Sequence, residues 1–217
     1  MSPEFLAILL VVLIFSVIVH EVMHGLVALY FGDHTAERAG RLTLNPIPHI
    51  DPIGTIFLPA ALLLPAILSG MSPQFFLAWA KPVPVNPLNF SDLRKGELFV
   101  SAAGVLANLS LALIGAIIYH LSNTAFTLPY LNVVALITVN INLLLAAFNL
   151  LPIPPLDGSK VLLSQLPYNL AREYQKIEPY GFLILIALLF IRIGDTSIIG
   201  IFLEIVVGNL SRLLIGS

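Results

Sequence analysis

The chain contains no cysteine, and this absence removes several kinds of site from consideration. Without thiols there is no disulfide framework, no thiolate zinc site and no cysteine nucleophile, so a bound metal would need His, Asp, Glu or Asn ligands. Charge is also scarce, because charged residues make up 10% of the 217 residues and the net charge is -2. Since no basic or acidic block is present, we expect no nucleic acid and no strongly charged partner.

Long polar segments are missing as well, and apolar ones take their place. Hydrophobic residues make up 58% of the chain, and the mean hydropathy is +0.98. Such a composition is typical of proteins embedded in a lipid bilayer. The absence of a polar linker, an internal repeat or a basic signal-like start predicts one membrane domain over residues 1–217, with the first apolar run retained as a helix.

The apolar runs predict an all-α polytopic membrane protein with about six transmembrane helices. Crossing about 30 Å of hydrocarbon takes roughly 20 helical residues. The runs cover residues 5–31, 53–68, 98–120, 131–151, 180–193 and 197–214. Between the first two runs, residues 41–44 alternate polar and apolar before a turn-rich stretch, which predicts a short membrane-associated strand or hairpin. The prolines of residues 81–87 predict an extended segment.

The ten Lys and Arg residues favour one topology, because cytoplasmic loops carry an excess of them. Six straight spans with the N-terminus inside would leave seven basic residues inside and three outside. If residues 53–80 instead form a re-entrant segment that bends at residues 69–73, and the N-terminus lies outside, only Arg192 faces out. We therefore expect a multi-pass protein of the cell membrane with the second topology, and a functional site on its cytoplasmic side beside the re-entrant segment.

The first apolar run contains the sequence His20-Glu21-Val22-Met23-His24. His20 and His24 are one helical turn apart, so both imidazoles project from one face and can bind one zinc ion. Glu21 lies beside that face and is the candidate general base. An ionisable group at the centre of a membrane helix costs roughly 2.5 to 3.5 kcal/mol, so the cluster calls for a compensating partner such as zinc. A structural His–Glu cluster is the alternative.

Asp157 is the expected third zinc ligand, because a catalytic zinc takes three protein ligands and keeps one open position. It follows a proline-rich break at the end of the 131–151 run, and Gly158 next to it permits a sharp turn. The alternative is that Asp157 only caps the following helix, residues 159–166. The re-entrant topology brings His24 and Asp157 to the same side of the membrane, whereas six straight spans separate them.

Three separated motifs resemble those of the site-2 protease family of intramembrane zinc metalloproteases. Residues 20–24 match the zinc motif of that family, and residues 149–158 match its N-x-x-P-x-P-x-x-D-G element, which implies Asp157 as the third ligand. Residues 103–108 are similar to its A-G-P-x-x-N element, with Val105 in place of the proline. Residues 79–86 resemble a segment of compact members without a PDZ or CBS domain. The catalytic core then covers about residues 5–166, and the last two helices are accessory.

The resemblance implies a function, a cofactor and a substrate class. It implies one Zn²⁺ per chain and hydrolysis of peptide bonds in membrane-spanning helices of substrate proteins within the bilayer. It also implies substrate contacts for Asn149 and Asn108, although helix–helix hydrogen bonding is an equally open role for Asn149. Because a helical substrate must unwind before cleavage, residues 41–44 or 81–86 are candidates for holding it by strand addition.

Several other polar residues have simpler explanations. His49 and Asp51 are expected in an interfacial turn rather than at a metal. Glu204, in the last apolar run, is expected to pair with Asn209, Arg212 or another helix. Asn140 and Asn142 are expected to join helices.

A second hypothesis from another class is a non-proteolytic protein that binds membrane helices or handles metal. Glu21 argues against a binding-only protein, which has no use for a general base. The sequence also has no series of acidic or His residues along a path across the membrane, as a zinc transporter would need. The sequence does not indicate an oligomeric state.

Overall fold

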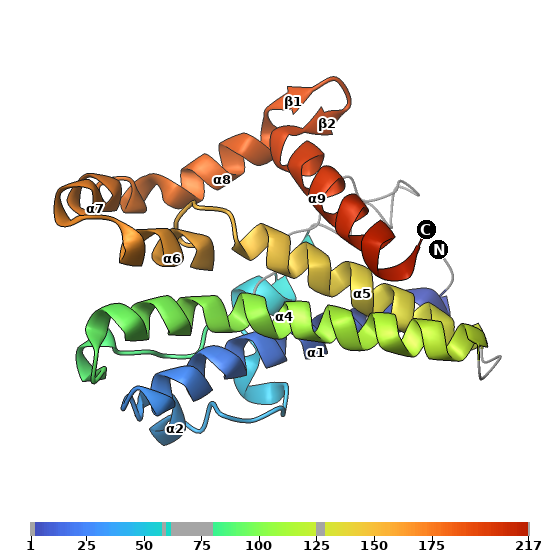
Figure 1. Cartoon of the computed structure of the whole chain (residues 1–217), viewed down its shortest axis with the longest axis horizontal. Helices are drawn as coiled ribbons and strands as arrows, with labels where there is room; N and C mark the ends of the chain where they lie inside the picture. Colours follow the sequence, from blue (N-terminus) through green and yellow to red (C-terminus); the bar gives the residue numbers. More distant parts are fainter. Residues whose placement is uncertain (1–2, 58–59, 62–79, 125–128, 217) are drawn as a thin grey trace.

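The computed structural model describes residues 3–57, 60–61, 80–124 and 129–216, and Figure 1 shows that they are mostly helical. Within these residues, four helices are long and apolar enough to cross a membrane, which supports a membrane protein. They are α1 (Pro3–Tyr30), α4 (Leu93–Thr124), α5 (Pro129–Asn149) and α9 (Ile198–Ile215). These helices correspond to four of the six predicted spans.

The other two predicted spans are not found as membrane-crossing helices in the described residues. The run at residues 180–193 forms α8 (Gly181–Phe190), whose ten residues extend about 15 Å, half of a hydrocarbon core. The run at residues 53–68 begins in a π-helical turn, η2 (Pro52–Phe57), and residues 62–68 lie outside the described residues. The prediction of six helical spans is therefore not confirmed.

The remaining elements are short and lie between the long helices. A helical turn and two 3₁₀ turns lie between α1 and α4, namely α2 (Thr35–Arg38), η1 (Ile47–His49) and η3 (Pro87–Asn89). After α5 come α6 (Asp157–Gln165), α7 (Tyr168–Gln175) and η4 (Glu178–Tyr180). A hairpin of β1 (Arg192–Ile193) and β2 (Thr196–Ser197) leads from α8 into α9.

The helix α4 runs antiparallel to both α1 and α5. Asn108 of α4 contacts Ser16 of α1, whereas Val100, eight residues earlier in α4, contacts His24, eight residues later in α1. Ser122 and Asn132 contact each other at the opposite end of the α4–α5 pair, where α4 ends and α5 begins. As a result, α1 and α5 are parallel and their C-terminal ends lie on the same side of the bundle.

This parallel arrangement of α1 and α5 is the one that the re-entrant topology requires, because six straight spans would place their C-terminal ends on opposite sides. The bend predicted at residues 69–73 lies outside the described residues.

Small residues allow the long helices to pack closely. Ala112 and Ala116 of α4 face Val139 and Leu143 of α5 in a buried cluster that Ile215 of α9 completes. Further contacts join α9 to the bundle, because Ser211 donates to the side chain of Asn140 at 3.2 Å and His120 Nε2 lies 2.8 Å from the carbonyl of Leu214. The end of α9 therefore lies beside the end of α4, at the same end of the molecule as the start of α1 (Figure 1).

The strand predicted at residues 41–44 does not form, because backbone groups in and after this segment have local partners. The Arg41 amide donates to the carbonyl of Ala36, and the carbonyl of Thr43 lies 2.9 Å from His49 Nε2. The Oγ1 of Thr43 accepts from the amide of Asn45, and the Oδ1 of Asn45 accepts from the amide of Ile47. Both bonds are local turns of the kind that compete with sheet pairing. The chain instead turns at Gly40, with φ of +64°, and buries the side chain of Arg41.

Residues 81–86 form a segment without helix, as the prolines predicted, whereas Pro87 already begins η3, and the main chain of the segment is anchored by side chains and loops. Arg41 Nη2 donates to the carbonyl of Lys81 at 2.6 Å, and the Lys81 amide donates to the carbonyl of His49 at 2.9 Å. The amide of Asn86 donates to Asp33 at 2.7 Å. These bonds fix the segment beside the C-terminal half of α1.

Candidate metal centre

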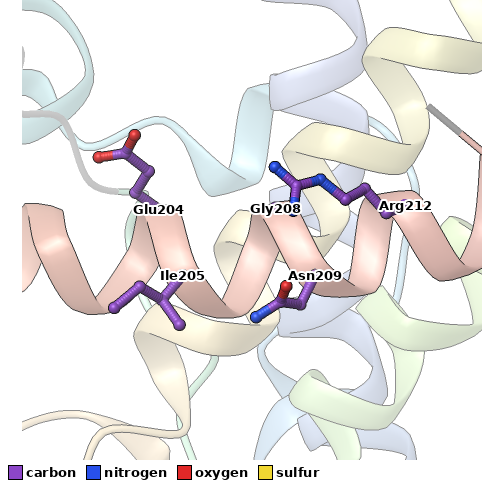
Figure 2. Close-up of a pocket in the computed structure, with 5 residues that line it drawn as sticks. All are labelled: Glu204, Ile205, Gly208, Asn209 and Arg212. Atoms are coloured by element: carbon purple, nitrogen blue, oxygen red, sulfur yellow. The ribbon is translucent and has the colours of Figure 1, made fainter.

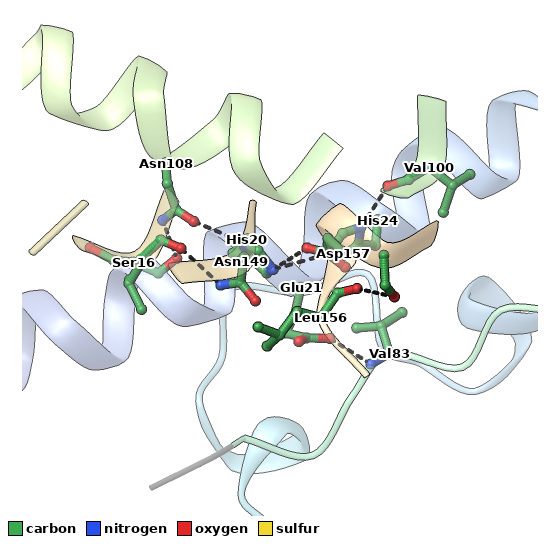
Figure 3. A network of polar contacts seen from close by, with 12 residues as sticks. Ser16, His20, Glu21, His24, Val83, Val100, Asn108, Asn149, Leu156 and Asp157 are labelled. Atoms are coloured by element: carbon green, nitrogen blue, oxygen red, sulfur yellow. Dashed lines mark hydrogen bonds and ion pairs between the residues drawn. The ribbon is translucent and has the colours of Figure 1, made fainter. Parts of the chain in front are cut away.

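Three side chains from two distant parts of the chain converge at one point (Figure 3). His20 and His24 lie one turn apart on α1, as the helical spacing predicts, with their Nε2 atoms 3.0 Å apart. Asp157 Oδ2 lies 3.1 Å from His20 Nε2 and 3.2 Å from His24 Nε2. Among the described residues, this is the one group of three such side chains whose ligand atoms could hold a metal ion.

Asp157 reaches the histidines because helix α5 ends abruptly and the backbone changes direction after it. Pro152, Pro154 and Pro155 prevent the helix from continuing. When α6 begins, its N-cap is Leu156, which makes no side-chain cap bond, so Asp157 does not act as the cap. The Oδ2 atom of Asp157 is buried and has no hydrogen-bond partner among the described residues.

Gly158 was expected to permit a sharp turn next to Asp157, but the structure gives it a different role. Its φ is not positive, so the turn does not need a left-handed glycine at this position. A Cβ on Gly158 would instead lie 2.1 Å from the carbonyl oxygen of Leu150. The missing side chain lets the start of α6 pack against the end of α5, and this contact brings Asp157 toward α1.

The hydrogen bonds of the two imidazoles define which ring nitrogens carry hydrogen. His24 Nδ1 lies 2.6 Å from the backbone carbonyl of Val100, which only accepts. His20 Nδ1 lies 2.7 Å from the amide oxygen of Asn108, which also only accepts. Both Nδ1 atoms therefore donate, and in the neutral rings both Nε2 atoms present lone pairs to Asp157.

The cluster of acceptors fits a zinc ion. Two lone pairs and a carboxylate oxygen at 3.0–3.2 Å repel one another, and one proton can bridge only one of the three pairs. Zinc with N and O ligands at about 2.0–2.1 Å in a tetrahedron would separate the ligand atoms by about 3.3 Å. With side chains only 9–12% exposed, the site also shields such an ion from bulk water.

Gly104 of α4 forms the wall behind the two imidazoles. A Cβ at this position would lie 2.4 Å from His20 Cε1 and 2.5 Å from His24 Nε2, closer than van der Waals contact allows. The sequence showed Gly104 only as part of the A-G element at residues 103–108. Its contact with the histidines depends on how α4 packs on α1, which no local pattern reports.

Glu21 lies beside the cluster but does not belong to it. Its Oε2 accepts a hydrogen bond of 2.8 Å from the backbone amide of Val83, in the extended segment (Figure 3). The side chain is partly buried. The general base expected from the sequence is thus held by the segment that was expected to contact substrate.

The two asparagines expected to bind substrate differ in their surroundings. Asn149, at the end of α5, is partly exposed and donates to the carbonyl of Leu145 of its own helix at 3.0 Å, so it makes no helix–helix bond among the described residues. Asn108 is completely buried, and its side chain contacts His20, Ser16 and Asn142. Asn108 thus contacts the histidine His20 in this structure, and its expected contact with substrate stays a prediction.

Other candidate residues lie apart from the centre. His49 is in the expected turn, but it is buried, with Nε2 2.9 Å from the carbonyl of Thr43, and Asp51 caps the local amides of Ile53 and Gly54. Neither belongs to a metal cluster in the described part of the chain.

Glu204 and Arg212 lie on the exposed surface of α9 on either side of Gly208 (Figure 2). They are eight residues, or about 12 Å, apart, so they do not pair with each other. In the described ranges, the expected pairing of Glu204 with Asn209 or Arg212 is not observed.

Long apolar helices and a buried His–His–Asp centre with an adjacent glutamate define a membrane protein of the metalloprotease class. The model of "Peptidase family M50" matches residues 120–192, which include Asp157. YwhC of Bacillus subtilis, named as a candidate zinc metalloprotease, is 37% identical over 193 residues, which cover 86% of this chain and 82% of the relative. Rip2 of Mycolicibacterium smegmatis, named in the same way, is 33% identical over 184 residues, 80% of this chain and 63% of the relative.

No solved structure matches the chain. The extent of the match to YwhC nevertheless shows the family, and the chain belongs to peptidase family M50, the site-2 protease family of zinc metalloproteases.

Proposed function

We propose that this protein is an intramembrane zinc endopeptidase that cleaves membrane-spanning helices of other proteins. The observation that carries the proposal is the convergence of His20 Nε2, His24 Nε2 and Asp157 Oδ2 on a helix able to cross a membrane. His20 lies ten residues before Tyr30, the last residue of α1, which is about 15 Å along the helix. In a bilayer with a hydrocarbon core of about 30 Å, the site would lie well below the surface.

The roles of the residues follow from their contacts. His20, His24 and Asp157 would hold one zinc ion per chain, and three is the number of protein ligands that a catalytic zinc takes. When bound, zinc would supply Lewis-acid polarisation of the scissile carbonyl and activation of a water molecule. Glu21 takes a proton from the attacking water and returns it to the leaving amine. The Val83 amide orients the Glu21 carboxylate for these transfers.

Substrate would be held in extended form along residues 80–86, since a helix hides its carbonyls in its own hydrogen bonds. Pro82 and Pro84 have no amide hydrogen, and the amides of Lys81 and Val83 are already bonded. The amide of Asn86 is bonded to Asp33, so among residues 81–86 the amide of Val85 alone has no partner within the described residues, and it is the donor proposed for substrate. Asn149 is the side chain proposed to contact the substrate backbone, because it is partly exposed at the end of α5, just before the segment that leads to Asp157.

The active site is proposed to face the cytoplasm of a cell membrane, with the N-terminus of the chain outside. Eight of the ten basic residues lie at the end of the bundle where α1 and α5 end, Arg192 lies in the hairpin before α9, and Arg212 lies near the opposite end. This distribution supports the orientation expected from the sequence. In this proposal α9 ends outside with Arg212, which departs from the sequence-based expectation that only Arg192 faces out, because α8 is too short to cross the membrane.

The test of this function is cleavage of a single-span membrane helix by the purified protein in lipid vesicles. We expect wild type to cleave it with one bound zinc, and Glu21→Gln to bind zinc equally but cleave at least about 100-fold more slowly, the low end for loss of a general base. Cleavage at the wild-type rate by Glu21→Gln would falsify the assignment. Zinc binding by wild type without any cleavage of the helix would instead favour the alternative, a protein that binds helices or handles metal without proteolysis.

A further inference from the structure

A chain of buried polar side chains leads from His20 into the centre of the helix bundle. Asn108 of α4 contacts His20, and its Nδ2 donates to Asn142 Oδ1 of α5 at 2.8 Å. The Nδ2 of Asn142 donates to Ser16 Oγ of α1 at 2.9 Å and to the carbonyl of Thr138 at 2.9 Å. Asn108 and Asn142 are 0% exposed, and no water is needed to complete these bonds.

The direction of each hydrogen bond in this row of side chains follows from the bond at its far end, between Asn142 and the carbonyl of Thr138. The backbone carbonyl of Thr138 can only accept, so Asn142 must turn its NH₂ group toward Thr138 and its oxygen toward Asn108. Asn108 must then present its NH₂ group to Asn142 and its oxygen to His20. The carbonyl of Ser16, 3.4 Å from Asn108 Nδ2, favours the same orientation through a longer contact than the 2.8 Å bond to Asn142. His20 is left with one possibility, in which Nδ1 donates and Nε2 keeps its lone pair.

We propose that Asn142 is a positioning residue for the metal centre, because it fixes the orientation of Asn108 and thereby the tautomer of His20. This inference rests on the proposed function for its purpose, but the relay itself can be measured without metal. His24 needs no such relay, since the carbonyl of Val100 defines its tautomer directly. A side chain one helix away from the ligands therefore controls one of the three ligand atoms.

Replacing Asn142 removes the bond that orients Asn108 and leaves the proposed zinc ligands themselves unchanged. In Asn142→Leu, only the 3.4 Å contact with the Ser16 carbonyl still holds the Asn108 amide. Asn108 can then rotate and offer NH₂ to His20 Nδ1, which permits the tautomer with hydrogen on Nε2, and Nε2 then has no lone pair for zinc. The matched control is Asn140→Leu, on the same helix, because Asn140 bonds Leu136 and Ser211 and lies outside the relay. The double variant Asn108→Asp with Asn142→Leu is the rescue, since an ionised carboxylate accepts from Nδ1 without direction from residue 142.

Two measurements test the relay. Nitrogen-15 spectra of the metal-free, histidine-labelled protein report the His20 tautomer, and competition with a chelator reports zinc affinity. For Asn142→Leu we expect mixed His20 tautomers and zinc binding weaker by about 10- to 100-fold, the usual effect of losing an outer partner of a ligand. Asn140→Leu should match wild type in both measurements, and Asn108→Asp should restore the single tautomer and tight binding.

The outcomes separate this proposal from the proposed function. If Asn142→Leu keeps the wild-type tautomer and affinity, or if its loss of affinity is not restored by Asn108→Asp, the relay is wrong. If wild type shows the single tautomer but binds no zinc at His20, the proposed function fails while the relay stands. Partial unfolding of Asn142→Leu would show as failed rescue, and it therefore counts against the proposal.

Discussion

Gly104 lies where any side chain would meet the imidazoles of His20 and His24. Because a Cβ there would lie 2.4–2.5 Å from these rings, we expect Gly104→Ala to displace them and weaken zinc binding by about tenfold or more. Gly208→Ala on α9 is the control, since a Cβ there meets nothing within 4 Å. In the control, alanine should leave zinc binding unchanged and raise helix stability by up to about 1 kcal/mol. Equal zinc affinity in both variants, measured with a chelator, would contradict the packing.

Asp33 joins the end of α1 to the extended segment and should make stability depend on pH. Burial raises the pKa of this carboxyl, but hydrogen bonds from Thr35, Asn86 and Asn89 outweigh it and hold the pKa below its usual value. Its contribution is therefore fully present above the unfolded pKa of about 3.9 and is lost as the pH falls through the lower folded pKa.

The measurement is thermal unfolding of wild type and Asp33→Asn at pH 7 and at pH 3. We expect Asp33→Asn to lose about 1–3 kcal/mol at pH 7, because its NH₂ group would face the amide of Asn86, and to lose less at pH 3. Asp195→Asn, exposed in the hairpin, should match wild type at both values. A gap between wild type and Asp33→Asn that widens toward pH 3 would show that the sign is wrong.

Among single residues, the sequence predicts the role of those whose relative positions are set by the local backbone. The one-turn spacing of His20 and His24 depends only on the helix, and Asp157 follows from a proline break together with topology. Asn108 and Gly104 could not be assigned, because their contacts with the histidines depend on the rotation of α4 about its axis. Polar residues in an apolar helix show that a partner exists, but they do not show which one.

At the scale of elements, the extended segment carries the next prediction. Val83→Pro removes the amide that holds Glu21, and its neighbours Pro82 and Pro84 already require extended backbone. We expect kcat to fall by about 10- to 100-fold, within the contribution of a general base, with zinc content unchanged. Val85→Pro should instead raise KM, because Val85 is the donor proposed for substrate. Steady-state cleavage in vesicles distinguishes the two, and identical effects of both variants would argue against separate roles.

Element boundaries were predictable where the apolar pattern is long. Residues 5–31 and 131–151 became α1 and α5 almost unchanged, because each is a long apolar run without proline. The alternating pattern at residues 41–44 was misleading, since Thr43 and Asn45 satisfy neighbouring amides themselves. The run at residues 180–193 is apolar throughout, yet α8 ends at Phe190 and the chain turns at Gly194 with φ of +65°.

At the scale of the whole molecule, the absence of cysteine allows the topology to be mapped by single-cysteine labelling. Tyr130 at the start of α5 and Tyr168 in α7 are both 80% exposed and lie at opposite ends of the bundle. We expect an impermeant maleimide to label Tyr130→Cys in intact cells, and Tyr168→Cys only after permeabilisation. A cysteine appended at the C-terminus should label like Tyr130→Cys, because α8 is too short to cross the membrane and α9 ends beside the end of α4. Both topologies considered from the sequence count residues 180–193 as a span and would protect it.

The position of Asp157 on a segment far from α1 in sequence has a consequence for the stability of the molecule. With zinc bound as proposed, the ion joins α1 to α6 and closes a loop that includes α4 and α5. A closure of this kind limits the conformations of the unfolded chain, as a disulfide does. In a protein without a single thiol, the active-site ion would also serve as a removable cross-link, and a chelator would act on the fold as a reductant acts on a secreted domain.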